Sequence, residues 1–291
     1  MLGSHSITLR KGSEKSFPAL FAITSTYLAI CLSLFCTGQA SAQSNSDTSA
    51  ATEFSQAQTF AAKSQYISAV KHYNKAIAAA PNNITYRYQR GLANLQLHCA
   101  DEALKDFEFC RARNPNMPIN SKLWAAAYRA ADQFQPAIEQ YTIALKSEPK
   151  KTQADVYYDR AQTYLEHDKY ALAAADYTSA ISLRPYEERY YRERAKCHEA
   201  MKDYAGALSD YDLSLKANPG NKSIYLSRAL CYSQLGKYKE SIDDYARAIA
   251  AKPNDAKAYA MRAKTYQKMG RNELAEKDRK TARELGEMFH I

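Results

Sequence analysis

The sequence contains few of the residues that form tight turns, with nine glycines and nine prolines among 291 residues. A β-sandwich or β-barrel needs many such turns, so this scarcity argues against both and favours helices. The sequence also lacks a phosphate-binding glycine loop, a His-Glu-x-x-His helix, a nucleophile elbow and a Cys-x-x-Cys pair. We therefore expect no enzymatic activity, no catalytic or metal-binding residues and no cofactor.

Basic and acidic residues are mixed along the chain, where 40 lysines and arginines and 31 aspartates and glutamates give a formal net charge of +9. The charge does not come from a basic tail, and no periodic array of aromatic and basic residues suggests a surface for stacking bases. We therefore expect neither a nucleic acid nor a small-molecule substrate as the partner.

The first 42 residues differ in character from all that follows. Three basic residues precede an apolar run over 19–35, and Ala40, Ser41 and Ala42 then form the small-x-small pattern that a signal peptidase accepts. The pattern predicts an export signal cleaved near Ala42 and a polar linker over 43–49. The mature protein is then periplasmic or secreted.

The apolar run allows a second interpretation. Its 17 residues, Ala19 to Phe35, lie at the short end of the range of about 17–25 residues that spans a bilayer. An uncleaved segment would anchor the chain through residues 19–35. Only in that case do we expect a membrane as a partner.

Prolines recur through the rest of the chain at spacings of 34, 34, 36, 34 and 34 residues. They are Pro81, Pro115, Pro149, Pro185, Pro219 and Pro253. Placing each at position 32 of a 34-residue repeat predicts seven repeats over residues 50–286. In chain order, repeats 1 to 7 cover 50–83, 84–117, 118–153, 154–187, 188–221, 222–255 and 256–286. We expect residues 287–291 to end a helix that caps the last repeat.

Small residues occupy three positions of every repeat: alanine or glycine at position 8, alanine or serine at position 20, and alanine, serine or cysteine at position 27. Position 24 is aromatic in the first six repeats, from Tyr73 to Tyr245. Together with the proline, these columns resemble the signature of the tetratricopeptide repeat family. The resemblance covers residues 50 to about 286. It implies an all-α fold, a right-handed superhelical solenoid of antiparallel helix pairs.

The residues themselves agree with such helix pairs, because each repeat has two amphipathic segments, at positions 1–14 and 17–30. Gly236 and Gly270 stand at position 15, where the first helix ends and a left-handed residue is expected; Asp132 and Asp168 take the same place elsewhere. Repeats 3 and 4 are separated by two additional residues, which we expect to lengthen the turn at 150–153.

Two charged columns recur in register. Position 7 holds Arg90, Arg160, Arg194, Arg228 and Arg262. Position 23 holds Asp106, Asp176, Asp210, Asp244 and Asp278. A residue that recurs in register in five of the seven repeats is expected to support the repeat rather than to bind a partner, so we predict arginine–aspartate contacts between packed helices.

The family resemblance places binding on the concave face, at positions 2, 5, 9, 12 and 13 of the first helix. The residues that we expect to line this groove are Lys122, Arg129, Tyr88, Tyr158, Arg189, Arg192, Lys196, Leu226, Leu230, Lys257, Lys264 and Lys268. Basic and apolar side chains complement an acidic, partly apolar peptide or protein surface. The sequence therefore predicts a protein-binding scaffold.

Other interpretations remain open at this stage. The charges at these positions serve equally well to solvate the inner face, and the repeats could instead associate with one another or, less in keeping with an export signal, bind nucleic acid. A subtype of the family that binds acidic chaperone tails has lysine at position 5 and asparagine at position 9. No repeat of this chain has asparagine at position 9, so this sequence does not fit the subtype.

Four cysteines lie in the predicted repeats: Cys99, Cys110, Cys197 and Cys231. Cys99 and Cys110 stand 11 residues apart on one predicted helix, a rise of about 16 Å, which no disulfide spans. Cys197 and Cys231 share position 10 of neighbouring repeats, whose helices pack about 8–10 Å apart. We therefore predict four free thiols that fill small spaces in the core.

Overall fold

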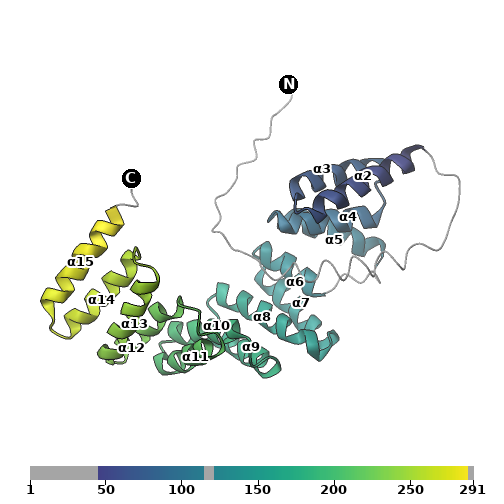
Figure 1. The fold of residues 1–291 in the computed structure, drawn as a ribbon. Helices are drawn as coiled ribbons and strands as arrows, with labels where there is room; N and C mark the ends of the chain where they lie inside the picture. Colours follow the sequence, from purple (N-terminus) through teal and green to yellow (C-terminus); the bar gives the residue numbers. More distant parts are fainter. Residues whose placement is uncertain (1–44, 115–120, 288–291) are drawn as a thin grey trace. The chain divides into compact units, whose positions relative to one another are not determined.

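The computed structural model describes residues 45–114 and 121–287. The predicted signal segment, its apolar run at 19–35 and the last four residues lie outside this part of the chain. Within it the chain forms fourteen α-helices and no strand (Figure 1). None of these helices is both long enough and apolar enough to cross a membrane. Residues 49–291 form one compact unit, which holds almost the whole described part.

The helices divide into two alternating sets. The first helices are α2 (Asn45–Ala62), α4 (Ile84–Gln96), α6 (Ser121–Ala130), α8 (Lys150–Glu166), α10 (Glu188–Ala200), α12 (Ile224–Gln234) and α14 (Ala256–Lys268). The second helices are α3 (Tyr66–Ala79), α5 (Ala100–Arg113), α7 (Phe134–Ser147), α9 (Tyr170–Leu183), α11 (Tyr204–Ala217), α13 (Tyr238–Ala251) and α15 (Asn272–Glu287).

From α3 to α15, every helix packs against the one before it and the one after it. Phe54 and Phe60 of α2 join α3 in a shared apolar cluster around Tyr73. Each first helix therefore contacts both its own second helix and that of the preceding repeat. This confirms the predicted all-α solenoid of antiparallel helix pairs.

Two predicted boundaries differ from the structure. Helix α2 begins at Asn45, so most of the stretch predicted as a linker at 43–49 is helical. Helix α8 begins at Lys150, so the two additional residues prolong this helix instead of lengthening the turn at 150–153. The side-chain amide of Gln153 explains the second difference, because it donates to the carbonyls of Leu145 and Glu148, at 3.1 and 3.0 Å, and ties the new turn to the end of α7.

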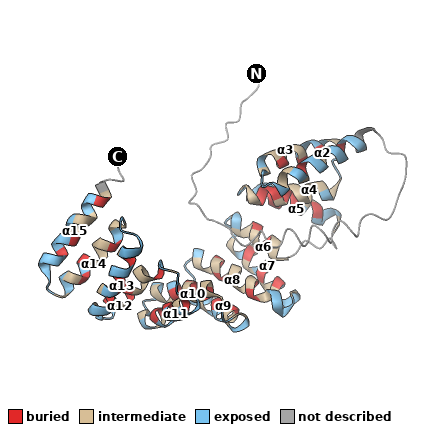
Figure 2. Cartoon of the chain, viewed as in Figure 1, coloured by how far each residue is buried: buried red, intermediate tan, exposed pale blue. Residues whose placement is uncertain are grey.

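The small columns form the centre of each helix pair (Figure 2). Alanines at positions 8 and 20 are fully buried in every repeat that has them. Gly91 replaces alanine at position 8 of repeat 2, where an added Cβ would lie 2.7 Å from the ring of Phe107. The helices thus approach closely only where one side chain is small, as the sequence predicts.

The aromatic ring at position 24 fills the space between one repeat and the next. All six rings, at 73, 107, 141, 177, 211 and 245, are at most 1% exposed. Phe107 packs against Trp124 of the following first helix, with ring centroids 5.7 Å apart, and Tyr141 packs in the same cluster as Val156. The cover over each ring therefore comes from the next repeat.

The turn inside each helix pair has the same conformation throughout. Position 15 has a positive φ, between 58° and 74°, in all seven predicted repeats. The predicted left-handed residues Asp132, Asp168, Gly236 and Gly270 are confirmed, and Ser64, His98 and Lys202 adopt the same conformation. The turn therefore imposes the left-handed conformation even on residues whose side chains make it sterically unfavourable.

The two charged columns meet as predicted. In all five pairs, Nε and Nη2 of the arginine on a first helix donate to the two carboxylate oxygens of the aspartate on its second helix, at 2.6–2.9 Å. The aspartates are at most 5% exposed. Such paired, charge-assisted hydrogen bonds fix the angle between two helices as well as their distance.

The same arginines also reach back to the preceding repeat. Nη1 donates to a side chain at position 25 of the preceding second helix: Asn74, Thr142, Thr178 and Asp212 accept at 2.7–2.9 Å. Arg262 makes no such bond, because position 25 of repeat 6 is Ala246. Each complete arginine thus joins three helices, and we call this arrangement the arginine ladder.

We expect Arg228→Met to lower the free energy of unfolding by about 3 kcal/mol, because it leaves Asp244 buried without its main partner. Arg247→Met provides the matched control. Arg247 also donates to Asp244, at 3.3 Å, but 58% of its side chain is exposed, so its loss should cost less than about 1 kcal/mol. Urea unfolding followed by circular dichroism measures both values, and equal losses would contradict a structural role for the ladder.

The four cysteines of the repeats are free, as predicted. Cys99 is exposed, whereas the other three are buried. Burial raises the pKa of the Cys110 thiol to about 11 and that of Cys197 to about 12, so little reactive thiolate is present near neutral pH.

Alkylation without reductant should therefore label Cys99 in the folded protein, and Cys110, Cys197 and Cys231 only after unfolding. Peptide mapping by mass spectrometry distinguishes the four positions. Protection of any pair from the reagent in denaturant, reversed by reduction, would reveal a disulfide and contradict this prediction.

Candidate partner-binding surface

The first helices carry the residues that the sequence predicts for binding. Positions 2, 5, 9, 12 and 13 of these helices define what we call the inner surface. Ion pairs join side chains of this surface across successive first helices, Arg129 to Glu166 from α6 to α8 and Asp155 to Arg189 from α8 to α10. Lys122 of α6 pairs with Asp159, which stands at position 6 of α8. The predicted residues of these helices therefore lie side by side.

Repeat 3 is paired with repeat 4. Nε and Nη2 of Arg129 donate to the two carboxylate oxygens of Glu166, at 2.9 and 2.8 Å, and Nζ of Lys122 lies 3.2 Å from Asp159. All four side chains are at least three-quarters buried. Burial raises the pKa of Asp159, and the nearby Lys122 opposes this effect. The charges of α6 are thus neutralised by acids of the next first helix.

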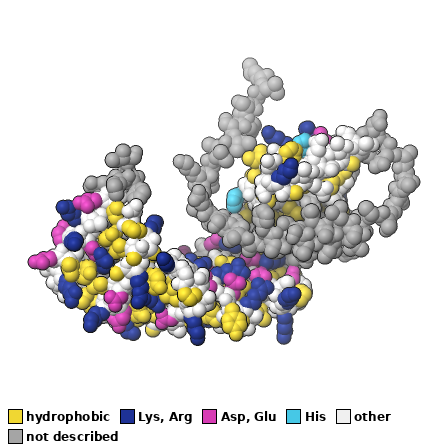
Figure 3. Space-filling view, viewed as in Figure 1, with side chains coloured by type: hydrophobic (Ala, Val, Ile, Leu, Met, Phe, Trp, Pro, Cys, Tyr) yellow, Lys and Arg dark blue, Asp and Glu magenta, His cyan; other side chains and the backbone are white. Residues whose placement is uncertain are grey.

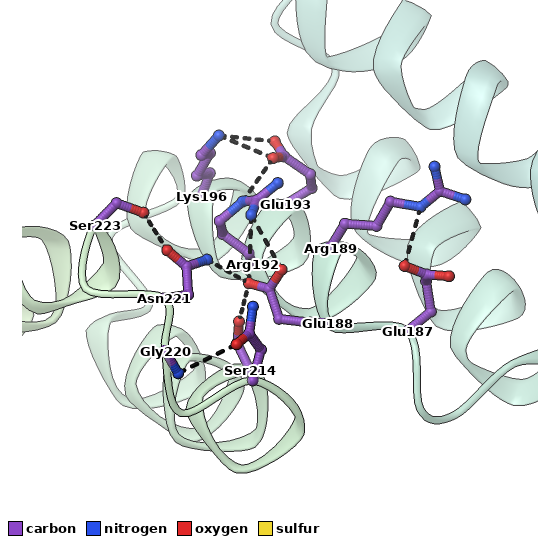
Figure 4. Close-up of polar contacts among 11 residues, drawn as sticks. Glu187, Glu188, Arg189, Arg192, Glu193, Lys196, Ser214, Gly220, Asn221 and Ser223 are labelled. Carbon is purple, nitrogen blue, oxygen red and sulfur yellow. Dashed lines mark hydrogen bonds and ion pairs between the residues drawn. The ribbon is translucent and has the colours of Figure 1, made fainter. Parts of the chain in front are cut away.

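Repeat 5 carries its own network of charges along α10 (Figure 4). Arg192 lies 3.1 Å from Glu188 and 3.2 Å from Glu193, and Lys196 lies 2.9 Å from Glu193. Glu188 also accepts hydrogen bonds from Ser214 Oγ and Asn221 Nδ2, at 2.5 and 2.9 Å. The two basic side chains are therefore held by acids of their own helix.

Arg189 lies at the boundary between repeats 4 and 5. Its guanidinium is 3.3 Å from Asp155, which also accepts from Arg184, and it sits 4.8 Å above the ring of Tyr158. Tyr158 in turn packs between Tyr177 and Tyr190, with centroid distances of 5.8 and 5.5 Å. Both predicted binding residues are thus part of a packed, paired arrangement.

Tyr88 of α4 also contributes to packing, because its ring lies 5.9 Å from that of Phe107. Lysine and arginine side chains lie interspersed with aspartate and glutamate over the lower part of the face shown in Figure 3. From α4 to α10, the structure therefore offers an organised surface of rings and ion pairs in which nearby acids offset the basic residues.

The inner surface of α12 and α14 differs from that of α6 to α10 in its charged side chains. Leu226 and Leu230 lie partly exposed on α12, and Lys257, Lys264 and Lys268 lie exposed on the neighbouring α14. The ammonium groups of these three lysines make no ion pair with a carboxylate of the described residues; the Asp255 carboxylate accepts only from the backbone N–H of Lys257, at 3.1 Å. An apolar strip beside a row of free cations is therefore found at α12 and α14.

Glu199 of α10 is a carboxylate of the inner surface that faces this region. It accepts a hydrogen bond from the Cys231 thiol, at 3.1 Å. Burial raises the pKa of Glu199, and the positive charges of Lys196 and Lys257 partly oppose the effect. The carboxylate therefore lies close enough to Lys196 and Lys257 for their charges to act on it.

A shallow hollow of about 480 Å³ opens between α14 and α15. It is lined by Ala256, Lys257, Ala260, Lys264, Arg279, Ala282 and Arg283. Arg279 and Arg283 of α15 are additions to the predicted set. One feature of the sequence sets Arg279 apart, because it stands at position 24, where the other repeats have an aromatic ring.

Comparison with known proteins identifies the repeat. Tetratricopeptide repeat family models match residues 123–188, 158–222 and 230–270. Among curated proteins, the chain is similar to Hsp70-Hsp90 organizing protein 3 of Arabidopsis thaliana, with 31% identity over 91 residues. This match spans 31% of the chain but only 16% of the relative.

Solved structures show the same fold. The C-terminal part of a tetratricopeptide repeat-containing protein from Cytophaga hutchinsonii matches with a TM-score of 0.63 and 21% identity, over 80% of this chain and 92% of its own. A tetratricopeptide repeat protein from Parabacteroides merdae gives 0.59 and 19%, over 82% and 94%. MamA gives 0.54 and 20%, over 57% and 96%. The chain therefore contains tetratricopeptide repeats over residues 123–222 and 230–270, and its described part has the α-solenoid fold of such proteins.

Proposed function

We propose that this protein is a non-catalytic scaffold that binds a protein or peptide partner on its inner surface. Tetratricopeptide repeats are in general protein-interaction modules, and the name of the Arabidopsis relative describes a protein that organises others. The match to this relative does not identify the partner of the present chain. No repeat here has the asparagine at position 9 that marks the chaperone-tail subtype, so we do not assign chaperone tails to this chain.

The single observation that carries the proposal is the composition of the surface at α12 and α14. Leu226 and Leu230 can bury apolar side chains of a partner, and the three exposed lysines of α14 can pair with its acids. We propose an acidic, partly apolar segment as the partner, bound mainly at this end. The paired charges of α6, α8 and α10 would orient the segment without adding a strong net attraction.

We also propose that all seven helix pairs are tetratricopeptide repeats, including those outside the matches at 123–222 and 230–270. Two features of the structure support this. The positive φ at position 15 recurs in every pair, and repeat 2 has the same Arg90–Asp106 contact as repeats 4 to 7.

We further propose that the scaffold works outside the cytoplasm. The support is the sequence of the first 42 residues, with basic residues, an apolar run and the Ala40-Ser41-Ala42 motif. A membrane anchor at 19–35 is the alternative form of the same proposal.

To test the binding surface, the full chain and its Lys264→Glu/Lys268→Glu variant are used as bait against an extract of the source cells. We expect partners held by the lysines to be depleted at least about tenfold by the variant, with a reduced sensitivity to salt in whatever binding remains. Lys216→Glu/Lys239→Glu makes the same charge change on the exposed sides of α11 and α13 and should retain these partners. Identical partner lists for all three proteins would overturn the assignment of the surface.

To test export, the native protein is isolated after fractionation of the source cells and its N-terminus is sequenced. We expect a chain that starts at Gln43 in the periplasmic or secreted fraction. A chain that retains residues 1–42 in the membrane fraction would favour the anchor, and one found in the cytoplasm with these residues intact would refute both forms of the proposal.

A further inference from the structure

Position 11, near the end of each first helix, carries an aromatic ring in six of the seven predicted repeats. These rings are Phe60, Tyr128, Tyr164, His198, Tyr232 and Tyr266. In repeat 2 the same position holds Asn94, which is only 6% exposed. Repeat 2 therefore has a small polar side chain at a buried position where the other repeats have a ring.

A hollow of about 250 Å³ lies beside Asn94, and we call it the repeat 2 hollow. A cavity of about 150 Å³ already accommodates a benzene ring, so this hollow has room for one. None of its lining residues stands at position 2, 5, 9, 12 or 13 of a first helix, so it is separate from the inner surface. The lining residues, from α3, α4 and α5, are Val70, Asn74, Arg90, Asn94, Glu102 and Lys105.

Repeat 6 shows what occupies the equivalent space when position 11 is tyrosine. Tyr232 packs against the apolar cluster that contains Leu208, and the guanidinium carbon of Arg228 lies 5.8 Å from the centre of its ring. Burial raises the pKa of Tyr232, and the carboxylates of Asp212 and Glu240 raise it further. The residues equivalent to these four neighbours are Val70, Arg90, Asn74 and Glu102. The repeat 2 hollow therefore lies where the other repeats have the ring at position 11.

The ladder arginine at this hollow receives no ring from its own repeat. In repeats 4, 6 and 7, the guanidinium carbon lies 5.8–5.9 Å from the ring at position 11. In repeats 4 to 7, it lies 5.5–5.9 Å from the ring at position 4. Repeat 2 has Arg87 and Asn94 at these two positions. A ring placed beside Arg90 would thus add a cation–π attraction that the other ladder arginines already have.

The rim of the hollow favours a side chain of a protein over a free small molecule. Ile67 of α3 lies one helical turn before Val70 and is 65% exposed. Residues three apart are neighbours on the surface of a helix, so Ile67 lies beside the hollow. Residues that flank a tyrosine in a partner can cover this isoleucine, which adds apolar contact that a lone phenol cannot make.

We propose that the repeat 2 hollow binds the ring of a tyrosine side chain from a partner protein. The ring takes the place of the missing side chain at position 11, between Val70 and Arg90, with its hydroxyl toward Asn74 and Glu102. This proposal rests on the protein-binding function but concerns α3, α4 and α5 away from the inner surface.

The probe for the ring is p-cresol, which is the side chain of tyrosine without its backbone. Ligand-observed NMR with the full chain should show saturable binding with a Kd on the order of 1 mM, because few atoms make contact. N-acetyltyrosinamide, which adds the backbone, should bind as well. 4-Methylcyclohexanol has a similar shape but no aromatic ring and should bind at least about threefold more weakly.

A matched pair of variants locates the probe on the chain. Asn94→Tyr fills the hollow with a ring of the chain itself, so it should weaken binding of p-cresol at least about tenfold. The same variant should raise the midpoint of thermal unfolding, followed by circular dichroism, by about 2–4 °C. Asn94→Ala leaves the hollow empty and should change the affinity for p-cresol less than about threefold, without raising this midpoint.

Four results would overturn the proposal. They are absent or non-saturable binding of p-cresol, binding that Asn94→Tyr leaves unchanged, a lower unfolding midpoint for Asn94→Tyr, and binding of p-cresol without binding of N-acetyltyrosinamide. The last result would make the hollow a site for free phenols. Equal affinity of 4-methylcyclohexanol would contradict recognition of the ring by Arg90.

The extract experiment on the inner surface is independent of this one. Lys264→Glu/Lys268→Glu changes residues outside the hollow and should bind p-cresol as the unmodified chain does. Identical partner lists in the extract experiment would refute the inner surface and leave binding of p-cresol unaffected. Failure of one proposal is thus distinguishable from failure of the other.

Discussion

The burial of the ring at position 24 beneath the next first helix is the contact on which the whole array depends. A single helix pair cannot cover this ring, so each repeat from 1 to 6 needs its successor. The small residues at positions 8 and 20 let the helices come close enough for the cover to be complete. The arginine ladder then sets the angle, because each complete arginine holds its own second helix and the one before it.

Much of this framework could be predicted from the sequence, because it depends on residue types that recur at a fixed spacing. The small columns, the rings and the arginine–aspartate pairs all have this property. The contact of each arginine with position 25 of the preceding second helix could not be predicted in this way. The residues that accept there, such as Asn74, Thr142 and Asp212, share only an oxygen acceptor and not a residue type. Ser64, His98 and Lys202 at position 15 were also not predictable from their own preferences, because the surrounding turn imposes a conformation that suits glycine better.

The binding surface was harder to predict than the fold, for a geometric reason. A sequence gives the number of charges on each first helix but not which of them meet across two helices. Arg129 and Glu166 are 37 residues apart and make a bidentate pair, so a residue expected to attract an acidic partner already has one. Lys264 has the same expected role and an exposed side chain, and its residue type alone does not show that it lacks the partner that Arg129 has. The two residues differ because α8 packs beside α6 and places Glu166 opposite Arg129.

The difference between Arg129 and Lys264 follows from their positions in the array. The two cations of α6 pair with Asp159 and Glu166, which both lie on the next first helix, α8. Among the described residues no further first helix follows α14, and position 24 of repeat 7 is Arg279 where repeats 1 to 6 have a ring. The Arg279 side chain is 38% exposed and stays hydrated, whereas an equally exposed tyrosine would favour unspecific association.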